Sequence, residues 1–266
     1  MLVAQKIKKK SLASRAMRKI KHFLKIPNIS LFPFALGKPF ILKTFLAYQP
    51  DSHNTFNAHP ELKSLFKKYI SYNKLNNAGD VVRLWSLILN IKQVMAERIE
   101  GDFAELGVWR GNTASVLAYY ASQHNREVYL FDTYQGFDKK DLEGIDANQE
   151  MKFHDTSLAL VKKVIGDESA CCHFIQGYFP DSLKNKKISR KFSVVSLDCD
   201  LHEPMKEGLR YFYPLMNKGG LFLLHDYSSM SWPGAKQAID AFCKKHDERI
   251  ILMPDKSGSA FIRKSR

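Results

Sequence analysis

The chain has 266 residues, 45% of them hydrophobic, which is enough to bury one substantial core and carry an appendage. Its formal net charge is +14, but residues 1–50 hold eleven Lys or Arg and no Asp or Glu. The other 216 residues hold 30 basic and 27 acidic side chains and are close to neutral. A nucleic-acid enzyme needs positive charge along its working groove, so this distribution argues against a nucleic-acid partner.

Residues 1–50 form a basic, apolar N-terminal arm. Its first half is predicted to be an amphipathic helix, because apolar residues recur at roughly helical spacing between the basic ones. These apolar residues are Ile7, Leu12, Ala16, Ile20 and Leu24. Three prolines interrupt the apolar stretch that follows, so we do not expect it to span a bilayer. No clean apolar core leads to a small-residue cleavage site, which argues against a signal peptide.

Two hypotheses remain open for this arm. It resembles segments that contact an anionic membrane surface, and that contact would involve residues 1–45. It could instead pack on a second subunit and support a homo-oligomer. We therefore expect a cytoplasmic protein, or one attached peripherally to the inner face of a membrane.

Residues 51–100 are predicted to be a helical cap or lid segment. One helix has an apolar face made by Leu62, Leu65, Phe66 and Tyr69. A longer helix is expected to begin after Asp80, whose side chain can cap its first turn. Its apolar face comprises Leu84, Trp85, Ile88, Ile91 and Met95.

Residues 101–266 are predicted to form an α/β domain in which strands and helices alternate. The strands are expected at 102–108, 127–132, 172–177, 192–198, 220–226, 249–254 and 259–264, and the helices near 112–123, 157–166, 204–216 and 234–246. Continuous apolar strands followed by helices indicate a parallel sheet covered on both faces, hence a doubly wound fold. The short link Asp255–Gly258 predicts a closing hairpin, so one of the seven strands is antiparallel. This ending resembles that of class I methyltransferases, here with an N-terminal helical extension.

A glycine-rich turn, Glu105–Asn112, follows the first predicted strand and opens a helix. Backbone N–H groups and the helix dipole at such a turn can bind a ligand. Gly107 and Gly111 are spaced G-x-x-x-G, whereas the dinucleotide fingerprint is G-x-G-x-x-G. The acidic Glu105 suits a ligand that carries an amine. These features favour S-adenosylmethionine over a dinucleotide.

Polar or acidic residues also end the next strands, where an α/β sheet binds its ligands. Asp132 is placed to accept hydrogen bonds from ribose hydroxyls, and Gly177, Tyr178 and Phe179 suit an adenine. One acidic strand end is more often a helix cap, but several in this order indicate a binding site. The candidate cofactor contacts are Glu105, Gly107, Trp109, Arg110, Gly111, Thr113, Asp132, Gly177, Tyr178, Phe179 and Asp198.

Asp198 and Asp226 follow two strands that should be neighbours, about 4.8 Å apart. Carboxylates this close repel each other without a cation, and oxygen ligands favour Mg²⁺ over zinc. Asp200 is either a further ligand or lies just behind the ligands. His225 could bind the metal, act as a base or cap the strand, so the candidate metal ligands are Asp198, His225 and Asp226.

Residues 83–240, about three-fifths of the chain, resemble the macrocin and mycinamicin sugar O-methyltransferase family. The matching segments are Arg83-Leu-Trp-Ser-Leu, Gly101–Gly111, Phe131–Phe137, Gln176–Leu183, Leu197–Glu203 and His225-Asp-Tyr227. The resemblance implies dependence on S-adenosylmethionine and Mg²⁺, with Glu105, Gly107 and Asp132 at the cofactor and Asp198 and Asp226 at the metal. The chain departs from the family at His225-Asp226, where members often carry two acids.

The activity implied is methyl transfer to a hydroxyl of a sugar, a glycosylated small molecule or a glycan. A base must take the hydroxyl proton, and His225, His202 and Asp198 are candidates. The loop 133–157 is expected either to close over the substrate or to be a plain connection. Trp232 could line the acceptor pocket or pack in the core.

Two alternatives from other classes remain. An oxidoreductase on the same sheet is disfavoured by the glycine spacing and the closing hairpin. A non-catalytic membrane- or partner-binding protein would work through the basic arm.

Overall fold

The computed structural model describes residues 61–184, 188 and 190–266. The predicted arm, residues 1–50, and the first ten residues of the predicted cap segment lie outside these described residues. The described residues from Glu61 onward belong to one compact unit, so the helices of the predicted cap segment belong to the same unit as the sheet.

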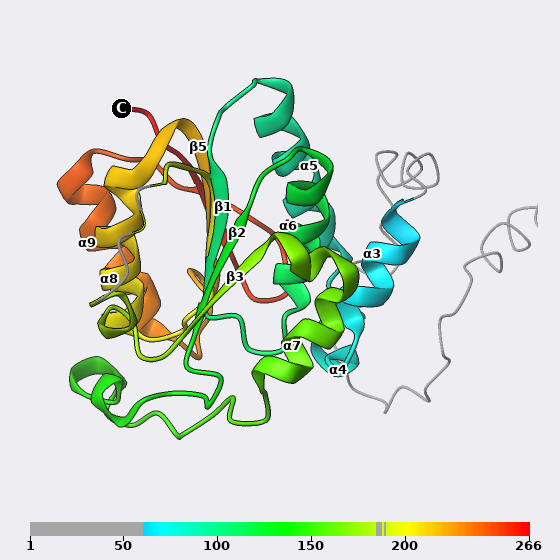
Figure 1. The fold of residues 1–266 in the computed structure, drawn as a ribbon. Helices are drawn as coiled ribbons and strands as arrows, with labels where there is room; N and C mark the ends of the chain where they lie inside the picture. The colour runs from blue at the N-terminus through cyan, green and yellow to red at the C-terminus, as the bar shows by residue number, and fades with distance from the viewer. Residues whose placement is uncertain (1–60, 185–187, 189) are drawn as a thin grey trace, which may run out of the picture. The chain divides into compact units, whose positions relative to one another are not determined.

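A seven-stranded sheet lies at the centre of this unit (Figure 1). In chain order its strands are β1 (Asp102–Leu106), β2 (Val128–Asp132), β3 (Cys172–Gln176), β4 (Phe192–Leu197), β5 (Met216–Leu224), β6 (Ile251–Leu252) and β7 (Ala260–Arg263). Across the sheet the order is β3-β2-β1-β4-β5-β7-β6. The five strands β1 to β5 are paired in parallel, and β7 runs antiparallel to both β5 and β6. The predicted doubly wound sheet with one antiparallel strand is confirmed.

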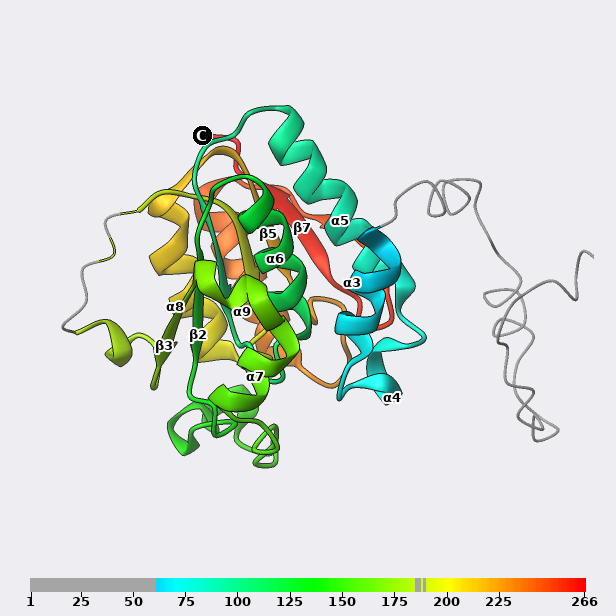
Figure 2. The same ribbon diagram turned by 45° about the vertical axis from the view of Figure 1, so that its right-hand side comes forward.

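Helices cover both faces of the sheet, as Figures 1 and 2 show. One face carries α3 (Glu61–Ile70), α5 (Val81–Ala96), α6 (Asn112–Gln123) and α7 (Leu158–Ile165), with the short α4 (Lys74–Asn77) between α3 and α5. The other face carries α8 (His202–Phe212) and α9 (Pro233–His246), which pack on each other. Because both faces are covered, β4 is buried along its whole length, including Ser193 and Ser196.

The helices that precede the sheet form as their sequence predicts. Leu62, Leu65 and Tyr69 of α3 are buried, whereas Phe66 is only half-buried. The Asp80 carboxylate accepts a hydrogen bond from the Arg83 backbone N–H at 3.3 Å, which caps α5. The predicted face of α5 is buried except for Met95, which is half-buried.

Several element bounds differ from the prediction. β5 begins at Met216, four residues earlier than predicted, because a register irregularity lets the chain pair with β4 before Leu221. β5 ends at Leu224, so His225 and Asp226 follow the strand. α8 ends at Phe212, since Pro214 has no N–H to continue an α-helix. β6 is only two residues long and lies at the sheet edge, where its side chains are exposed.

Candidate functional site

A cavity of about 400 Å³ opens at the carboxyl ends of the parallel strands. Its walls include most of the predicted site residues: Glu105, Gly107, Trp109, Thr113, Asp132, Gly177, Tyr178, Phe179, Asp198, His225 and Asp226. Three predicted residues, Arg110, Gly111 and His202, are not among its walls. The fold therefore brings the ends of β1 to β5 together at one site, as expected for an open α/β sheet.

In the turn after β1, position 107 has a backbone conformation and a close neighbour that only glycine can accommodate. Gly107 has a φ of +86°, and a Cβ atom there would lie 2.1 Å from the carbonyl oxygen of Asp198. Gly111 has a φ of +80° and is the N-terminal cap residue of α6. The two glycines thus let the turn approach β4 closely and then start the helix.

Asp132, at the end of β2, holds this turn in place. Its Oδ2 accepts hydrogen bonds from the backbone N–H groups of Val108 at 2.6 Å and Trp109 at 2.8 Å. Its Oδ1 accepts a third from the N–H of Tyr134 at 2.6 Å. Burial raises the pKa of Asp132, and these backbone donors oppose that shift. The carboxylate that is predicted to contact the ribose therefore also holds the glycine-rich turn Glu105–Asn112, the cofactor turn.

Glu105 is a buried acidic residue on the wall of the cavity. Its side chain is buried, and its Oε2 atom has no hydrogen-bond partner among the described residues. Burial, followed by the nearby Asp198 carboxylate, raises its pKa well above the ordinary value. A buried carboxylate oxygen without a donor, on a cavity wall, suits a ligand with an ammonium group. The methionine part of S-adenosylmethionine carries such a group, so the site fits this cofactor.

The Arg110 side chain points toward the 133–157 loop and not into the cavity. It forms an ion pair with Asp155 and donates to the backbone carbonyl of Tyr72. The indole N–H of Trp109 donates to the same Asp155 carboxylate at 2.9 Å. These contacts join the cofactor turn to the end of the 133–157 loop.

That loop supplies an aromatic wall to the cavity. Phe137 and Phe153 come from the loop, and their ring centroids lie 5.6 Å and 6.1 Å from that of Trp232. Trp232 is buried in the hydrophobic core and also lines the cavity. The loop contains two short 3-10 turns, Lys139–Asp141 and Gly144–Asp146.

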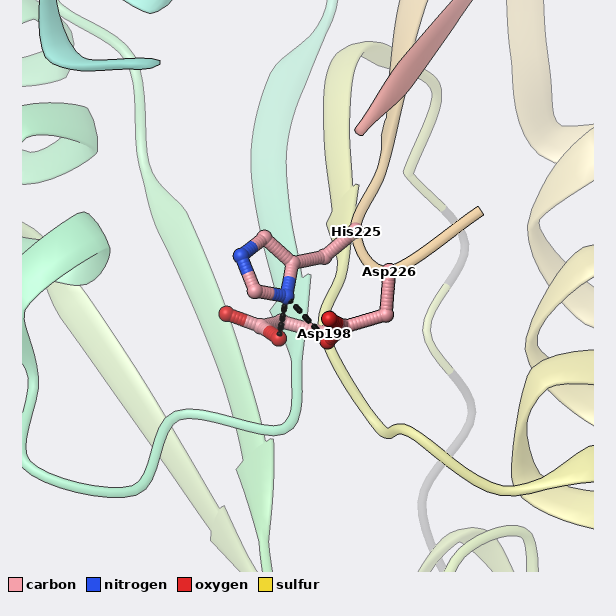
Figure 3. Close-up of side chains that lie close together, drawn as sticks. All are labelled: Asp198, His225 and Asp226. Atoms are coloured by element: carbon pink, nitrogen blue, oxygen red, sulfur yellow. Dashed lines mark hydrogen bonds and ion pairs between the residues drawn. The ribbon is translucent and has the colours of Figure 1, made fainter. Parts of the chain in front are cut away.

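Asp198, His225 and Asp226 form a cluster beside the cofactor turn (Figure 3). Leu197 of β4 pairs with Leu224 of β5, so the residues that follow the two strands are neighbours. The Nδ1 atom of His225 lies 2.6 Å from Asp198 Oδ1 and 2.5 Å from Asp226 Oδ2. One ligand atom from each residue lies within 4.8 Å of the others, which is compact enough for a metal ion.

The charges of this cluster depend on one another. Burial alone would lower the pKa of His225, but the carboxylates of Asp198 and Asp226 outweigh it and raise this pKa well above its ordinary value. Burial alone would raise the pKa of Asp226, but His225 outweighs it and lowers that pKa. Asp200 also lines the cavity and has a left-handed backbone conformation, with φ of +59°. Burial, then Asp226 and Asp198, raise the pKa of Asp200 well above its ordinary value.

His202 does not reach this cluster. It is the first residue of α8, and its Nδ1 lies 3.0 Å from Glu203 Oε1. Its backbone N–H donates to the Asp146 carboxylate at 2.7 Å. As placed, His202 is thus a helix-terminal residue outside the cavity wall and not positioned as a base.

Arg83 and Asp141 are among the cavity residues that were not predicted from the sequence. Arg83 is buried and lines the cavity beside His225, and its spacing from Leu87, Ile91 and Val94 puts a charged residue on a buried helix face. A charged residue on an otherwise apolar helix face could have marked Arg83 as a candidate site residue. Asp141 accepts a hydrogen bond from the Tyr178 hydroxyl at 2.7 Å, and burial raises its pKa to about 6. No local pattern marks Asp141, because its partner is distant in sequence.

Comparison with known proteins places this site in a family. Residues 78–261 match the family described as macrocin O-methyltransferase. Demethyldecarbamoylnovobiocin O-methyltransferase from Streptomyces niveus is 27% identical over 181 residues, which cover 63% of this chain and 67% of that protein. Mycinamicin III 3''-O-methyltransferase from Micromonospora griseorubida is 26% identical over 182 residues, which cover 62% of this chain and 68% of that protein.

Solved structures support the fold. The O-methyltransferase NovP aligns with a TM-score of 0.59 and 22% identity, covering 70% of this chain and 81% of NovP. The calicheamicin methyltransferase CalS11 aligns with a TM-score of 0.57 and 21% identity, covering 86% of this chain and 98% of CalS11. The matched residues include the whole cofactor turn and the Asp198–Asp226 cluster. The chain belongs to the macrocin O-methyltransferase family of S-adenosylmethionine-dependent O-methyltransferases.

Proposed function

We propose that this protein transfers a methyl group from S-adenosylmethionine to a hydroxyl of a sugar, carried by a glycosylated small molecule or a glycan, with the help of Mg²⁺. The observation that carries the proposal is one cavity walled by both the glycine-rich turn and the Asp198–Asp226 pair. The names of the relatives support a sugar acceptor, since one is a mycinamicin III 3''-O-methyltransferase. Another is a 4'-O-methyltransferase of a rhamnosyl tetracenomycin from Streptomyces olivaceus, 26% identical over 55% of this chain and 60% of that protein.

The cofactor end of the cavity would bind S-adenosylmethionine, which supplies the methyl group on its sulfonium. Glu105 would accept hydrogen bonds from the cofactor ammonium, because its Oε2 lacks another donor. Asp132 would accept from the ribose, and Gly177, Tyr178 and Phe179 would surround the adenine. Holding the donor and acceptor in line in this way contributes a large part of the rate.

The other end would hold the cation. Asp198 and Asp226 offer carboxylate oxygens at one point, a donor set that fits a hard cation such as Mg²⁺. When bound, the cation makes the acceptor hydroxyl more acidic. Asp198 would then accept the hydroxyl proton, since it lines the cavity and His202 does not.

Two further roles are part of the proposal. The 133–157 loop would close over the acceptor, since Phe137 and Phe153 already line the cavity. Residues 1–45 would contact an anionic membrane surface from the cytoplasmic side or pack on a second copy of the chain. Among the described residues, no helix combines the length and the apolar character needed to span a bilayer.

The proposal is tested by following S-adenosylhomocysteine formation over a panel of alkyl rhamnosides and glucosides. The full chain is assayed with Mg²⁺ and again with EDTA. Turnover with at least one glycoside, reduced by EDTA and restored by Mg²⁺, is the expected result. Turnover that EDTA leaves unchanged would contradict the cation, and no turnover with any glycoside would contradict the sugar acceptor.

A further inference from the structure

Asp146 is a buried carboxylate in the 133–157 loop, and its neighbours come from distant parts of the chain. The residue is 0% exposed. Its Oδ2 accepts a hydrogen bond at 2.7 Å from the backbone N–H of His202, the first residue of α8. Its Oδ1 is also buried and has no hydrogen-bond partner among the described residues. The N-cap residue of α8 is Leu201, whose side chain cannot cap, so Asp146 caps this helix from the loop.

The same carboxylate lies over the start of α9. Gly234 is the second residue of that helix, and the N-cap residue Trp232 makes no side-chain cap. A Cβ atom on Gly234 would lie 2.4 Å from Asp146 Oδ2 and 2.5 Å from Oδ1. The carboxylate therefore occupies the space that a side chain at position 234 would fill. The peptide dipoles of a helix stabilise negative charge at its N-terminus, and Asp146 lies at two such termini.

A second contact anchors the same stretch of the loop. The Gln149 side chain donates a hydrogen bond to the Ser231 carbonyl at 2.9 Å, directly before α9. In the chain, Phe137 and Phe153 lie on either side of this anchored stretch, and the rings of both contact Trp232 in the cavity wall. The position of the aromatic wall therefore depends on where the loop is docked.

We propose that Asp146 is a positioning residue that docks the 133–157 loop onto the N-termini of α8 and α9, and that Gly234 leaves the space for it. The docked loop presents its two phenylalanine rings to the acceptor. When the loop is released, the acceptor has to bind a cavity that lacks this wall. This role rests on the proposed function, because the acceptor is assigned there. The backbone of His202, and not its imidazole, then serves the site.

The first experiment compares Asp146→Ala with the wild-type full chain, using a glycoside that the wild type methylates. The KM for the glycoside should rise about tenfold with kcat unchanged, because docking becomes a minor state that a saturating acceptor still captures. The Kd of S-adenosylmethionine should not change, since Asp132 holds the cofactor turn. Glu143→Ala, exposed in the same loop, is the control and should keep the wild-type KM. An unchanged KM in Asp146→Ala, or an equal loss of cofactor affinity, would overturn the proposed role.

Gly234→Ala tests the same contact from the helix side. Alanine favours a helix more than glycine does, so α9 itself should not be weakened. The added methyl group should displace the Asp146 carboxylate and reproduce the rise in KM. In the Asp146→Ala background it should add nothing, because no carboxylate is left to displace. A further rise of KM in the double variant would contradict the pairing of Asp146 with Gly234.

Limited trypsin digestion tests the docking without any acceptor, so it separates this role from the proposed function. Lys139 and Lys140 are exposed in the loop. Cleavage after them, identified by mass spectrometry, should be about tenfold faster in Asp146→Ala and Gly234→Ala than in wild type, since cleavage follows the released population. Faster cleavage would support the docking even if no glycoside is methylated. Cleavage at the wild-type rate in both variants would overturn it, and if Asp146→Ala does not fold, Gly234→Ala decides.

Discussion

The two ends of the cavity are built differently. At the cofactor end, Asp132 accepts three backbone N–H groups from fixed turns. At the proposed cation end, the carboxylates of Asp198 and Asp226 both contact one side-chain atom, Nδ1 of His225. Backbone donors hold their geometry with or without a ligand, whereas a side-chain donor can rotate or change its charge. We infer that the cofactor end is preformed and that the cation end depends on its ligands.

The largest expected effect lies at the cation end. Asp198→Asn removes one charge from the proposed cation ligands, so kcat should fall about 100-fold, as for the loss of an important metal-site group. The apparent Mg²⁺ requirement should rise, measured as the rate against Mg²⁺ concentration. The matched control is Asp247→Asn, an exposed residue after α9, which should change neither value. A normal rate and Mg²⁺ requirement in Asp198→Asn would place the cation elsewhere.

A substitution in the glycine-rich turn after β1 tests whether the cofactor end is preformed. Gly107→Ala would put a Cβ atom 2.1 Å from the Asp198 carbonyl at a φ of +86°. The free energy of unfolding should fall by about 2 kcal/mol or more, from backbone strain and overpacking. Chemical denaturation measures this value. Gly79→Ala is the control, because nothing lies within 4 Å of the added atom, and it should be nearly neutral. Equal stability of the two variants would contradict a tightly packed turn.

Asp141 lines the cavity, and its substitution tests how burial in the cavity wall affects the stability of the protein. Its pKa is raised by burial to about 6 in the folded protein. The folded state therefore binds this proton more tightly than the unfolded state, and stability is lost as pH rises from about 4 to about 6. Asp141→Asn removes that loss, so the stability of the variant relative to wild type should be higher at pH 7 than at pH 4.5, by about 1–2 kcal/mol. Denaturation at the two pH values checks this, and a pH-independent difference would be contrary evidence.

The smallest effect is expected where the cofactor turn meets the loop. The Arg110–Asp155 ion pair is partly exposed, with the Asp155 side chain 56% accessible. Asp155→Asn should lower the free energy of unfolding by no more than about 0.5–1 kcal/mol, since exposed ion pairs contribute little. A loss of several kcal/mol would mean that the turn is held by the loop rather than by Asp132.

Features that depend on neighbouring residues could be predicted from the sequence, whereas contacts between distant residues could not. The mostly parallel sheet, the antiparallel β7 and the Asp80 cap follow from local patterns, and the structure confirms them. The strand ends were also found, because each carries a polar residue after an apolar run. The contacts across the site were not found, since Arg83 meets His225 from 142 residues away in the chain.

Turn geometry accounts for other differences. Asp200 and Asp226 have positive φ angles, so strand alternation no longer fixes where their side chains point. His202 follows a β-strand end in sequence, but it starts α8 and turns toward Glu203. Arg110 lies in the glycine-rich turn but pairs with a loop that no local pattern connects to it.

The central claim is that this cavity binds S-adenosylmethionine through a preformed end. It is tested most directly by calorimetric titration of the cofactor into the full chain, once with Mg²⁺ and once with EDTA. We expect saturable binding in both conditions, and binding about tenfold weaker in Glu105→Gln, where an amide replaces the carboxyl group that would face the cofactor ammonium. Absence of binding by the wild-type chain in both conditions would contradict the account.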